Sequence, residues 1–445
     1  MSHDDWNKSD DFVLYLSSPV NPFDRGFEGL EEILAVIESL DDGLRPDLVS
    51  LKRRVKYSRQ TVRQRLREAF VVNGYALRFV RSHPPQTNVL LSSWAGTEHA
   101  GFSVELRISP LSFLRTPERS EEYVEHLVDF VRALAARLPI SYGRGHSQTD
   151  FFLSSDPLAA SVLAAPRVQE AFWLNVYGPP MLEQVGRQRA LSAPATLIEQ
   201  LPGGAILLLT RPTPTDFDSE EARLAQGRTL VHLRPELDLE FTLATLRQRS
   251  LVFTPIPIQF DPDVADILSW EVELRGLANK RQNVELFNRY CPPPISEWLP
   301  ASQAPEPDVE DVKAAIDSFA SVYAEQLIAL FHKEEPVVMD GTVEALPRMD
   351  FRLWHFQWAK NLSPEQRETL VTALGGWLGR YLVDLLGGRW VPRRRLEETA
   401  VIIGDRAWLP FLRARHALQN VDAPLDYSCS QLFREAQRLA GQKPP

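Results

Sequence analysis

The chain has 445 residues, of which 44% are apolar and 24% charged, and its 59 acids and 49 bases give a net charge of -10. This composition excludes a largely disordered chain, a collagen-like repeat and a coiled-coil rod. The acidic balance argues against a protein that binds nucleic acid along its whole length. The length exceeds what one hydrophobic core usually holds and predicts two or three domains.

The cysteines and the N-terminal residues indicate in which cellular compartment the protein is expected. Cys291 and Cys429 lie far apart, without the paired spacing of a disulfide framework or a zinc site, which favours a reducing environment. The first twelve residues hold four aspartates and a single lysine, so they do not form a signal peptide. The most apolar short run, 205–209, is too short for a membrane helix. We therefore expect a cytoplasmic protein that does not enter a membrane.

The N-terminal part mixes strands and helices without a regular β-α-β rhythm, which predicts an α+β fold with an antiparallel or mixed sheet. Apolar residues every three or four positions predict helices, and alternation predicts strands. In the helix expected over 120–138, Ser120 is the candidate N-cap. The expected strands are 12–16, 76–80, 89–92, 102–108, 172–176 and 206–210, and the expected helices are 27–40, 59–72, 120–138, 219–233 and 239–248.

Proline locates the predicted domain boundary. The chain holds 34 prolines, and six of them fall within 291–307, CPPPISEWLPASQAPEP. Such a stretch is extended and semi-rigid and cannot form a helix, so we interpret it as a linker. It separates an N-terminal unit, 1–290, whose first 75 residues are a candidate subdomain, from a smaller α+β domain, 308–445.

The C-terminal domain is predicted from helix signals. Apolar residues recur over 309–331, and Ser363-Pro-Glu-Gln366 is a capping box that begins a helix ending at Gly387. Glycine is unfavourable inside a helix, so Gly375, Gly376 and Gly379 predict close packing against a neighbouring element. A strand over 400–403 and a helix over 429–439 complete the domain.

Catalytic signatures are scarce. The sequence has no phosphate-binding loop, no dinucleotide fingerprint, no Gly-x-Ser-x-Gly and no His-Glu-x-x-His. We expect no cofactor and no metal ion. One constellation remains, Tyr142-Gly-Arg-Gly-His146-Ser-Gln-Thr-Asp150, in which His146 and Asp150 are candidate acid/base or metal-binding groups. The alternative interpretation, which we prefer, is a glycine turn before a strand at 151–153.

Two charged stretches are candidate partner surfaces. The first, 52–67, has eight basic residues and no acid, and a helix would align Arg59, Arg63 and Arg67. This pattern fits nucleic acid or, as we prefer, a helix face that neutralises acidic neighbours. The second, 306–344, has ten acids and two lysines, which fit a basic partner or the polar face of a helix. Its candidate contact residues are Asp308, Glu310 and Asp311.

The segment 172–294 resembles a known family. Its Trp173-Leu-Asn-Val-Tyr-Gly-Pro stretch, LVHLRPEL at 230–237 and NRYCPPPISEW at 288–298 are similar to the fifty-second immunity-protein family of bacterial polymorphic toxin systems. The resemblance implies a cytoplasmic α+β protein that binds and occludes a cognate toxin, in many cases a nuclease, without turnover. Trp173, Asn175, Tyr177 and Gly178 match the motif, where packing and turn formation are their expected roles. Trp173 is also a candidate interface anchor.

Two alternatives to an immunity protein stay open at this point. One is a hydrolase or nuclease that uses His146 in an unfamiliar site. The other is a scaffold or defence component in which the C-terminal domain binds a second partner. That domain, around 374–390, looks like a small uncharacterised domain of bacterial proteins, which the immunity family does not need.

Overall fold

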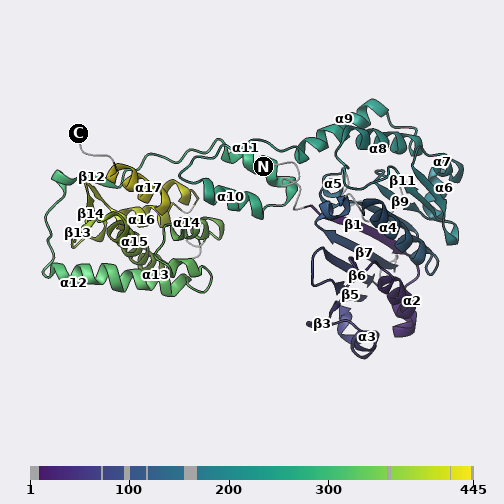
Figure 1. Ribbon diagram of the computed structural model, residues 1–445, viewed down its shortest axis with the longest axis horizontal. Coiled ribbons are helices and arrows are strands. Elements are labelled where there is room, and N and C mark those ends of the chain that lie inside the picture. Colours follow the sequence, from purple (N-terminus) through teal and green to yellow (C-terminus); the bar gives the residue numbers. More distant parts are fainter. Residues whose placement is uncertain are drawn as a thin grey trace. The chain divides into compact units, whose positions relative to one another are not determined.

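The chain forms two compact units in the computed structural model (Figure 1). Unit 1 comprises Met1–Pro257 and Gly276–Arg281, and unit 2 comprises Ile258–Arg275 and Gln282–Pro445. The structure describes residues 10–71, 74–94, 101–116, 119–154, 168–357, 360, 362–420 and 422–441. Both units combine helices with an antiparallel sheet, which confirms the predicted α+β class.

Unit 1 is built on an eleven-stranded antiparallel sheet of order β10-β11-β9-β8-β1-β7-β6-β5-β2-β3, with β4 paired to β5. Four of the predicted strands lie within β1, β5, β6 and β7, and the other two, 172–176 and 206–210, overlap β9 and β11 with bounds shifted by one or two residues. The bounds are β1 Phe12–Ser18, β2 Leu48–Ser50, β3 Arg54–Lys56, β4 Phe70–Val71, β5 Gly74–Val80, β6 Gln86–Trp94, β7 Gly101–Ser109, β8 Tyr142–Ser147, β9 Leu174–Tyr177, β10 Leu197–Gln200 and β11 Ile206–Leu209.

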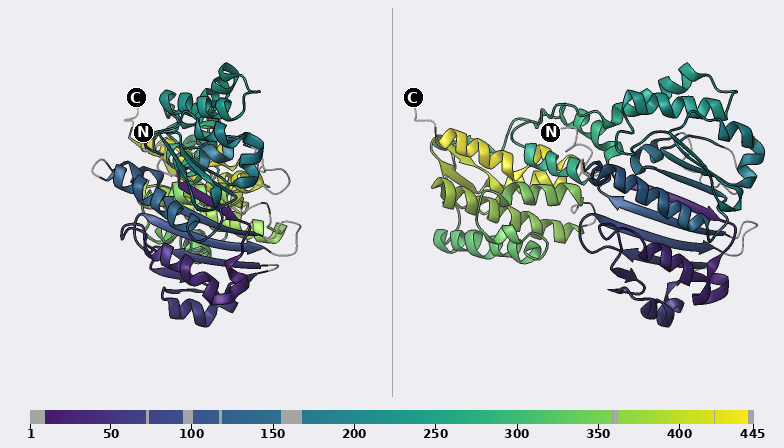
Figure 2. Two further views of the ribbon diagram at one scale, coloured as in Figure 1. Left: turned by 90° about the vertical axis from the view of Figure 1, so that its right-hand side faces the viewer. Right: turned by 45° about the vertical axis from the view of Figure 1, so that its right-hand side comes forward.

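One face of this sheet is the core of unit 1. Side chains along β1 alternate between buried and half-buried, as the period of two in a strand requires. On the buried side, Leu14 pairs across the sheet with Leu106 of β7 and Gly145 of β8. Helices α2, Gly26–Glu38, and α4, Ser120–Ala135, pack their apolar sides here (Figure 2). The opposite side of β1, β5, β6 and β7 carries half-exposed residues.

The predicted helices of unit 1 are present with shifted bounds. The helix expected over 59–72 is α3, Arg59–Arg65, followed by the 3-10 turn Leu66–Ala69 and by β4, because Phe70 and Val71 pair with β5 instead. Arg119, not Ser120, occupies the N-cap of α4, without a side-chain bond. The other helices are α5 Gln148–Leu153, α6 Pro179–Val185, α7 Arg187–Leu191, α8 Glu220–Leu233 and α9 Leu239–Ser250.

Unit 2 is arranged around α15, Pro364–Leu386. The predicted capping box of Ser363 and Gln366 begins this helix, and Gly387 ends it with a left-handed φ of 69°. Helices α13, α16 and α17 contact it, and so does β14 of a four-stranded sheet of order β12-β15-β14-β13. The bounds are α10 Ala265–Leu274, β12 Trp298–Pro300, α12 Val312–Asp317, α13 Ala324–Phe331, α14 Ala345–His355, β13 Arg389–Val391, β14 Ala400–Ile403, β15 Arg406–Trp408, α16 Pro410–Gln419 and α17 Cys429–Ala440. Helix α11, Leu277–Phe287, begins in unit 1 and belongs to unit 2 from Gln282 on.

The proline-rich segment does not separate the two units. The chain divides near residue 258, and 291–307 belongs entirely to unit 2. Trp298 and Pro300 lie in β12 and pair with Trp408 and Arg406 of β15, while Glu297 is fully buried. Proline excludes a helix or a central strand but is tolerated in an edge strand, which β12 is. The proline count alone therefore gave the wrong boundary.

The helical run Val312–Phe331 is the one described segment long and apolar enough, by length and composition, to span a membrane. It is continuous from α12 through a π-helical turn, Ser318–Tyr323, into α13. Phe319, Leu327 and Phe331 of this run are buried in the core of unit 2.

The glycines of α15 test the packing of unit 2. A Cβ at Gly376 would lie 2.7 Å from Cβ of Tyr323 and 2.8 Å from the Phe319 carbonyl oxygen. The favourable helix propensity of alanine does not offset that overlap, so we expect Gly376→Ala to lower the free energy of unfolding of unit 2 by about 1–3 kcal/mol. Urea unfolding measures the loss, and Thr369→Ala on the exposed side of α15 is the control. Unchanged or increased stability of Gly376→Ala would contradict this packing.

Candidate functional site

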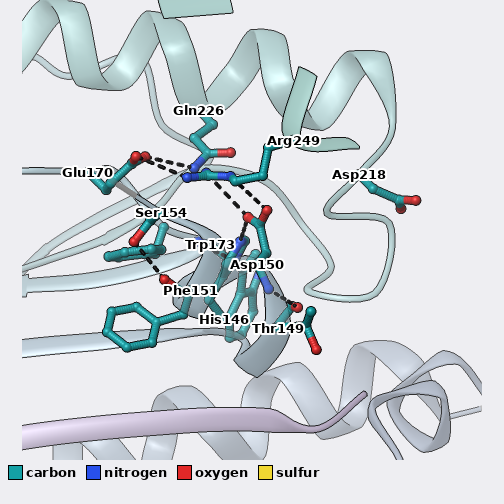
Figure 3. Close-up of polar contacts among 12 residues, drawn as sticks. His146, Thr149, Asp150, Phe151, Ser154, Glu170, Trp173, Asp218, Gln226 and Arg249 are labelled. Carbon is teal, nitrogen blue, oxygen red and sulfur yellow. Dashed lines mark hydrogen bonds and ion pairs between the residues drawn. The ribbon is translucent and has the colours of Figure 1, made fainter. Parts of the chain in front are cut away.

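His146 and Asp150, the one acid/base pair that the sequence suggested, meet in the interior of unit 1 (Figure 3). His146 lies on β8 and Asp150 on α5, not on the predicted turn and strand. Ser147 begins α5 immediately after the strand, because its hydroxyl accepts a hydrogen bond from the Asp150 N–H. One helical turn then places the Asp150 Oδ2 atom 2.6 Å from Nε2 of His146.

Both ring nitrogens of His146 are occupied. The backbone N–H of Trp173 donates to Nδ1 at 3.3 Å, so Nε2 carries the proton and donates it to Asp150. Burial lowers the pKa of His146 to about 4, and the ring is neutral at pH 7. A general base or metal ligand needs a free nitrogen lone pair, and in His146 that lone pair already accepts a protein hydrogen bond.

Two arginines from distant helices hold Asp150. Arg223 of α8 forms a bidentate pair with its carboxylate at 2.7 and 2.8 Å. Nε of Arg249, from α9, lies 2.9 Å from Oδ1, and the same guanidinium reaches Glu170 (Figure 3). Burial alone would raise the pKa of Asp150, but the two arginines outweigh it and hold that pKa well below its usual range. The carboxylate is therefore ionised and fully engaged.

The surrounding residues close this charged centre. Arg223 also donates to Ser250 Oγ at 2.7 Å and to Gln226 Oε1 at 3.0 Å. Burial lowers the pKa of a third arginine, Arg211, to about 9, and Arg211 pairs with Asp216. His146, Asp150 and Arg223 are each at most 4% exposed. We conclude that this centre joins β8, α5, α8 and α9 structurally and does not present a catalytic group.

A second buried carboxylate, Asp10, borders the same centre. It accepts hydrogen bonds from the Ser147 hydroxyl at 2.6 Å and from the Thr149 N–H at 3.1 Å. Burial nonetheless raises the pKa of Asp10 from 3.8 to about 6. Because the folded state binds this proton more tightly than the unfolded state, Asp10 disfavours folding increasingly as the pH rises from about 4 to 6.

The variant Asp10→Asn should lack this pH dependence. Between pH 4 and pH 7, the stability of Asp10→Asn relative to the native protein should rise by about 2 kcal/mol, because folding raises the pKa of Asp10 from 3.8 to about 6. Urea unfolding at both pH values, with other titrating groups shared by the two proteins, measures the difference. A difference that is the same at pH 4 and pH 7 would contradict it.

The residues of the family-like motif form core and turns. Trp173 is fully buried, and its indole N–H donates to the Arg211 carbonyl at 2.9 Å. Asn175 Oδ1 accepts from the Phe172 N–H and its amide donates to the Phe172 carbonyl, which closes the turn before β9. A Cβ at Gly178 would approach the Ser141 carbonyl oxygen to 2.6 Å. Tyr177 is also buried. Trp173 therefore packs in the core and is not an exposed interface anchor.

The predicted basic ridge is largely neutralised within unit 1. Arg59 Nε lies 2.9 Å from Glu38, and Arg63 lies 2.9 Å from Glu31, both on α2. Arg67 is exposed on the 3-10 turn after α3 and is not aligned with the other two on one helix. This arrangement matches the interpretation of a face that neutralises acidic neighbours.

The acidic candidates also have partners in their own unit. Asp308 lies 3.2 Å from Arg393 and accepts from the Arg394 N–H, while Glu310 lies 4.0 Å from Arg394. Asp311 caps α12 by accepting from the Ala314 N–H at 2.9 Å. All three side chains are exposed, but capping and local ion pairs account for Asp308 and Asp311, and Glu310 makes the longest of these contacts.

The arginines of the buried centre escaped the sequence analysis, although a signal for them exists. Arg223 shares the buried side of α8 with Leu230 and Leu233, and Arg249 shares that of α9 with Leu243 and Leu246. An arginine on the apolar stripe of a helix has to find a buried acid, since burying an unpaired charge is costly.

A row of side chains crosses five strands on the other side of the sheet from α2 and α4, and of its members Arg78 is exposed and the other four are partly buried. Pairing places Arg78 of β5 beside Leu90 of β6, Glu105 of β7, Tyr15 of β1 and Arg144 of β8, in that order. We call these five residues the open face. Arg144 also lies over the Phe151 ring, 3.3 Å from its centroid, which extends the surface onto α5.

The open face combines aromatic, aliphatic and arginine side chains, whereas the charged centre beside it is sealed. Aromatic residues and arginine are enriched where proteins bind one another. The arrangement thus suits contact with another macromolecule better than turnover of a substrate. No family model, curated protein or solved structure matches this chain.

Proposed function

We propose that this protein is a cytoplasmic immunity protein that binds and occludes a cognate bacterial toxin through the open face of unit 1, without catalysis. The observation that carries the proposal is the row of exposed and partly buried residues across five strands. A rigid sheet presents such side chains at fixed spacing, which limits the entropy lost on binding. The resemblance of 172–294 to immunity proteins supports the same reading and implies a nuclease as the toxin.

The closed centre also supports binding over turnover. An enzyme that used His146 would need a free ring nitrogen, and both nitrogens are engaged. The open face differs from the acidic surface expected from the sequence. Its charged residues have both signs, and Tyr15 and Leu90 lie between them, so the toxin surface should offer an apolar patch with an acidic group for Arg78.

Co-expression with the product of the adjacent gene tests the proposal. The native protein should restore growth and co-purify with the toxin. The double variant Arg78→Glu, Leu90→Asp should weaken binding at least ~30-fold, which corresponds to about 2 kcal/mol at the centre of an interface. Titration calorimetry measures the affinity, and circular dichroism verifies that the variant is folded.

A matched double variant elsewhere on unit 1 serves as the control. Arg228 is exposed on α8 and Leu251 follows α9 with its side chain 47% exposed. Arg228→Glu, Leu251→Asp makes the same chemical changes away from the open face and should leave affinity unchanged. If the open-face variant still protected cells fully from the toxin, the toxin would have to bind another surface. If the native protein did not bind the toxin, the immunity role would be refuted for that toxin.

A further inference from the structure

Unit 2 contains a cavity that the proposed function does not use. Its volume is about 380 Å3, within the range of small-molecule sites. The walls come from α10, from the end of α11, from α14 and from the segment 422–426. All of these residues belong to unit 2, so the cavity is formed within one compact unit.

The walls of the cavity are mainly apolar and aromatic. Leu268 and Leu425 are buried, and Phe287 packs edge-to-face on Trp354 with ring centroids 5.8 Å apart. Leu286 lines the cavity while 61% exposed, which places an aliphatic side chain where the cavity meets solvent. These surfaces favour a flat or chain-like apolar body of limited size.

The charged groups at the cavity are unequally engaged. Asp426 accepts the Tyr290 hydroxyl at 2.7 Å, and Asp422 pairs with Lys360 at 3.1 Å. Arg289 lines the cavity and is exposed, and within the described part of the chain its guanidinium has no ion pair or hydrogen bond. The Tyr290 hydroxyl is neutral, so Asp426 keeps its negative charge while accepting that hydrogen bond. The charged group at the cavity that engages no described residue is the Arg289 guanidinium, and a guanidinium complements an anion.

We propose that this cavity binds a small organic carboxylate whose apolar body, aromatic or aliphatic, lies against Phe287 and Trp354 while its carboxylate pairs with Arg289. A planar guanidinium binds a carboxylate through two parallel hydrogen bonds, which gives both affinity and orientation. This site is independent of the toxin-binding proposal. It gives unit 2, most of which lies outside the segment 172–294 that resembles immunity proteins, the function of a small-molecule-binding domain.

Three probes of equal ring size separate the contributions: naphthalene-2-carboxylate, naphthalen-2-ylmethanol and naphthalen-2-ylmethylammonium. Calorimetry on the full chain should show saturable binding of one carboxylate per chain, at least tenfold tighter than the alcohol, with the ammonium weakest. Arg289→Gln should reduce carboxylate affinity to that of the alcohol and leave alcohol affinity unchanged. Trp354→Ala should weaken both ligands, whereas Arg389→Gln, an exposed arginine at the start of β13, should change neither.

Several results would overturn the proposal. They are the absence of saturable binding by all three probes, a preference for the ammonium, and carboxylate binding that Arg289→Gln leaves intact. A fourth is self-association, seen as a molecular mass in solution that increases with protein concentration and that Leu286→Asp reduces to that of a monomer. That result would mean that a second copy of the chain occupies the cavity. Thermal unfolding of each variant distinguishes lost binding from lost structure.

Discussion

The substitution Asp150→Asn is expected to lower the free energy of unfolding of unit 1 by about 3–5 kcal/mol, the range found when one member of a buried ion pair is removed. Asp150 is fully buried, and its carboxylate forms ion pairs with Arg223 and Arg249 and accepts a hydrogen bond from His146. Asparagine keeps the shape but leaves two buried guanidiniums beside each other. Domains are commonly stable by only 5–15 kcal/mol, so this loss is a large share of the total.

Unit-specific hydrogen exchange in urea measures this loss, because it follows amides of β1 and β7 separately from those of α15. Unit 2 has its own core and should be unaffected. Asp129→Asn on the exposed side of α4 is the control and should change stability by at most about 0.5 kcal/mol. The double variant Asp150→Asn, Arg249→Gln restores the charge balance and should recover part of the loss.

The effect should also depend on pH with a defined sign. The arginines hold the pKa of Asp150 below its usual range, so its contribution is present above the unfolded pKa and fades as the pH falls into the acid range. The difference in free energy of unfolding between the native protein and Asp150→Asn should therefore become smaller as the pH is lowered. A loss below about 1 kcal/mol at pH 7 would show that the centre is weakly coupled to folding.

Local signals predicted much of the fold because they depend on neighbouring residues. The apolar stripe of α2, the capping box and terminal glycine of α15 and the alternation in β7 are all local patterns, and each element forms close to where it was predicted. Gly375, Gly376 and Gly379 indicated close packing correctly, since each approaches a bulky side chain or backbone of a neighbouring element. Features that depend on residues close together in the sequence could therefore be predicted from the sequence.

The partners of each element could not be predicted, because they depend on chain segments far apart. His146 and Asp150 were recognised as a pair, yet their meaning comes from Arg223 and Arg249, which lie on α8 and α9. The open face similarly exists only once β5, β6, β7, β1 and β8 are in register. The sequence thus supplied candidate residues, and tertiary contacts decided which of them are sealed and which are exposed.

The second large effect is expected at Glu297, inside the segment that the sequence marked as a linker. Glu297 is fully buried, and its carboxylate oxygens accept hydrogen bonds from two residues of α16. The distances are 3.0 Å to a guanidinium nitrogen of Arg413 and 2.6 Å to Nδ1 of His416. Burial alone would raise the pKa of Glu297, but Arg413 and His416 outweigh it and lower that pKa. Glu297→Gln leaves the buried Arg413 without its carboxylate, so unit 2 should lose about 3–5 kcal/mol.

The two interpretations of this segment predict different outcomes. In a linker, Glu297→Gln would be silent, like Glu306→Gln at an exposed position of the same segment, which is the control. In an integral edge of the sheet, as the pairing of β12 with β15 requires, only Glu297→Gln should accelerate exchange of the α15 amides, and unit 1 should not respond. If both variants had equally small effects on the exchange of the α15 amides, the interpretation of 291–307 as a linker between domains would be supported. A selective loss in unit 2 would mean that a fragment beginning after Pro307 lacks an edge strand and a buried counter-charge.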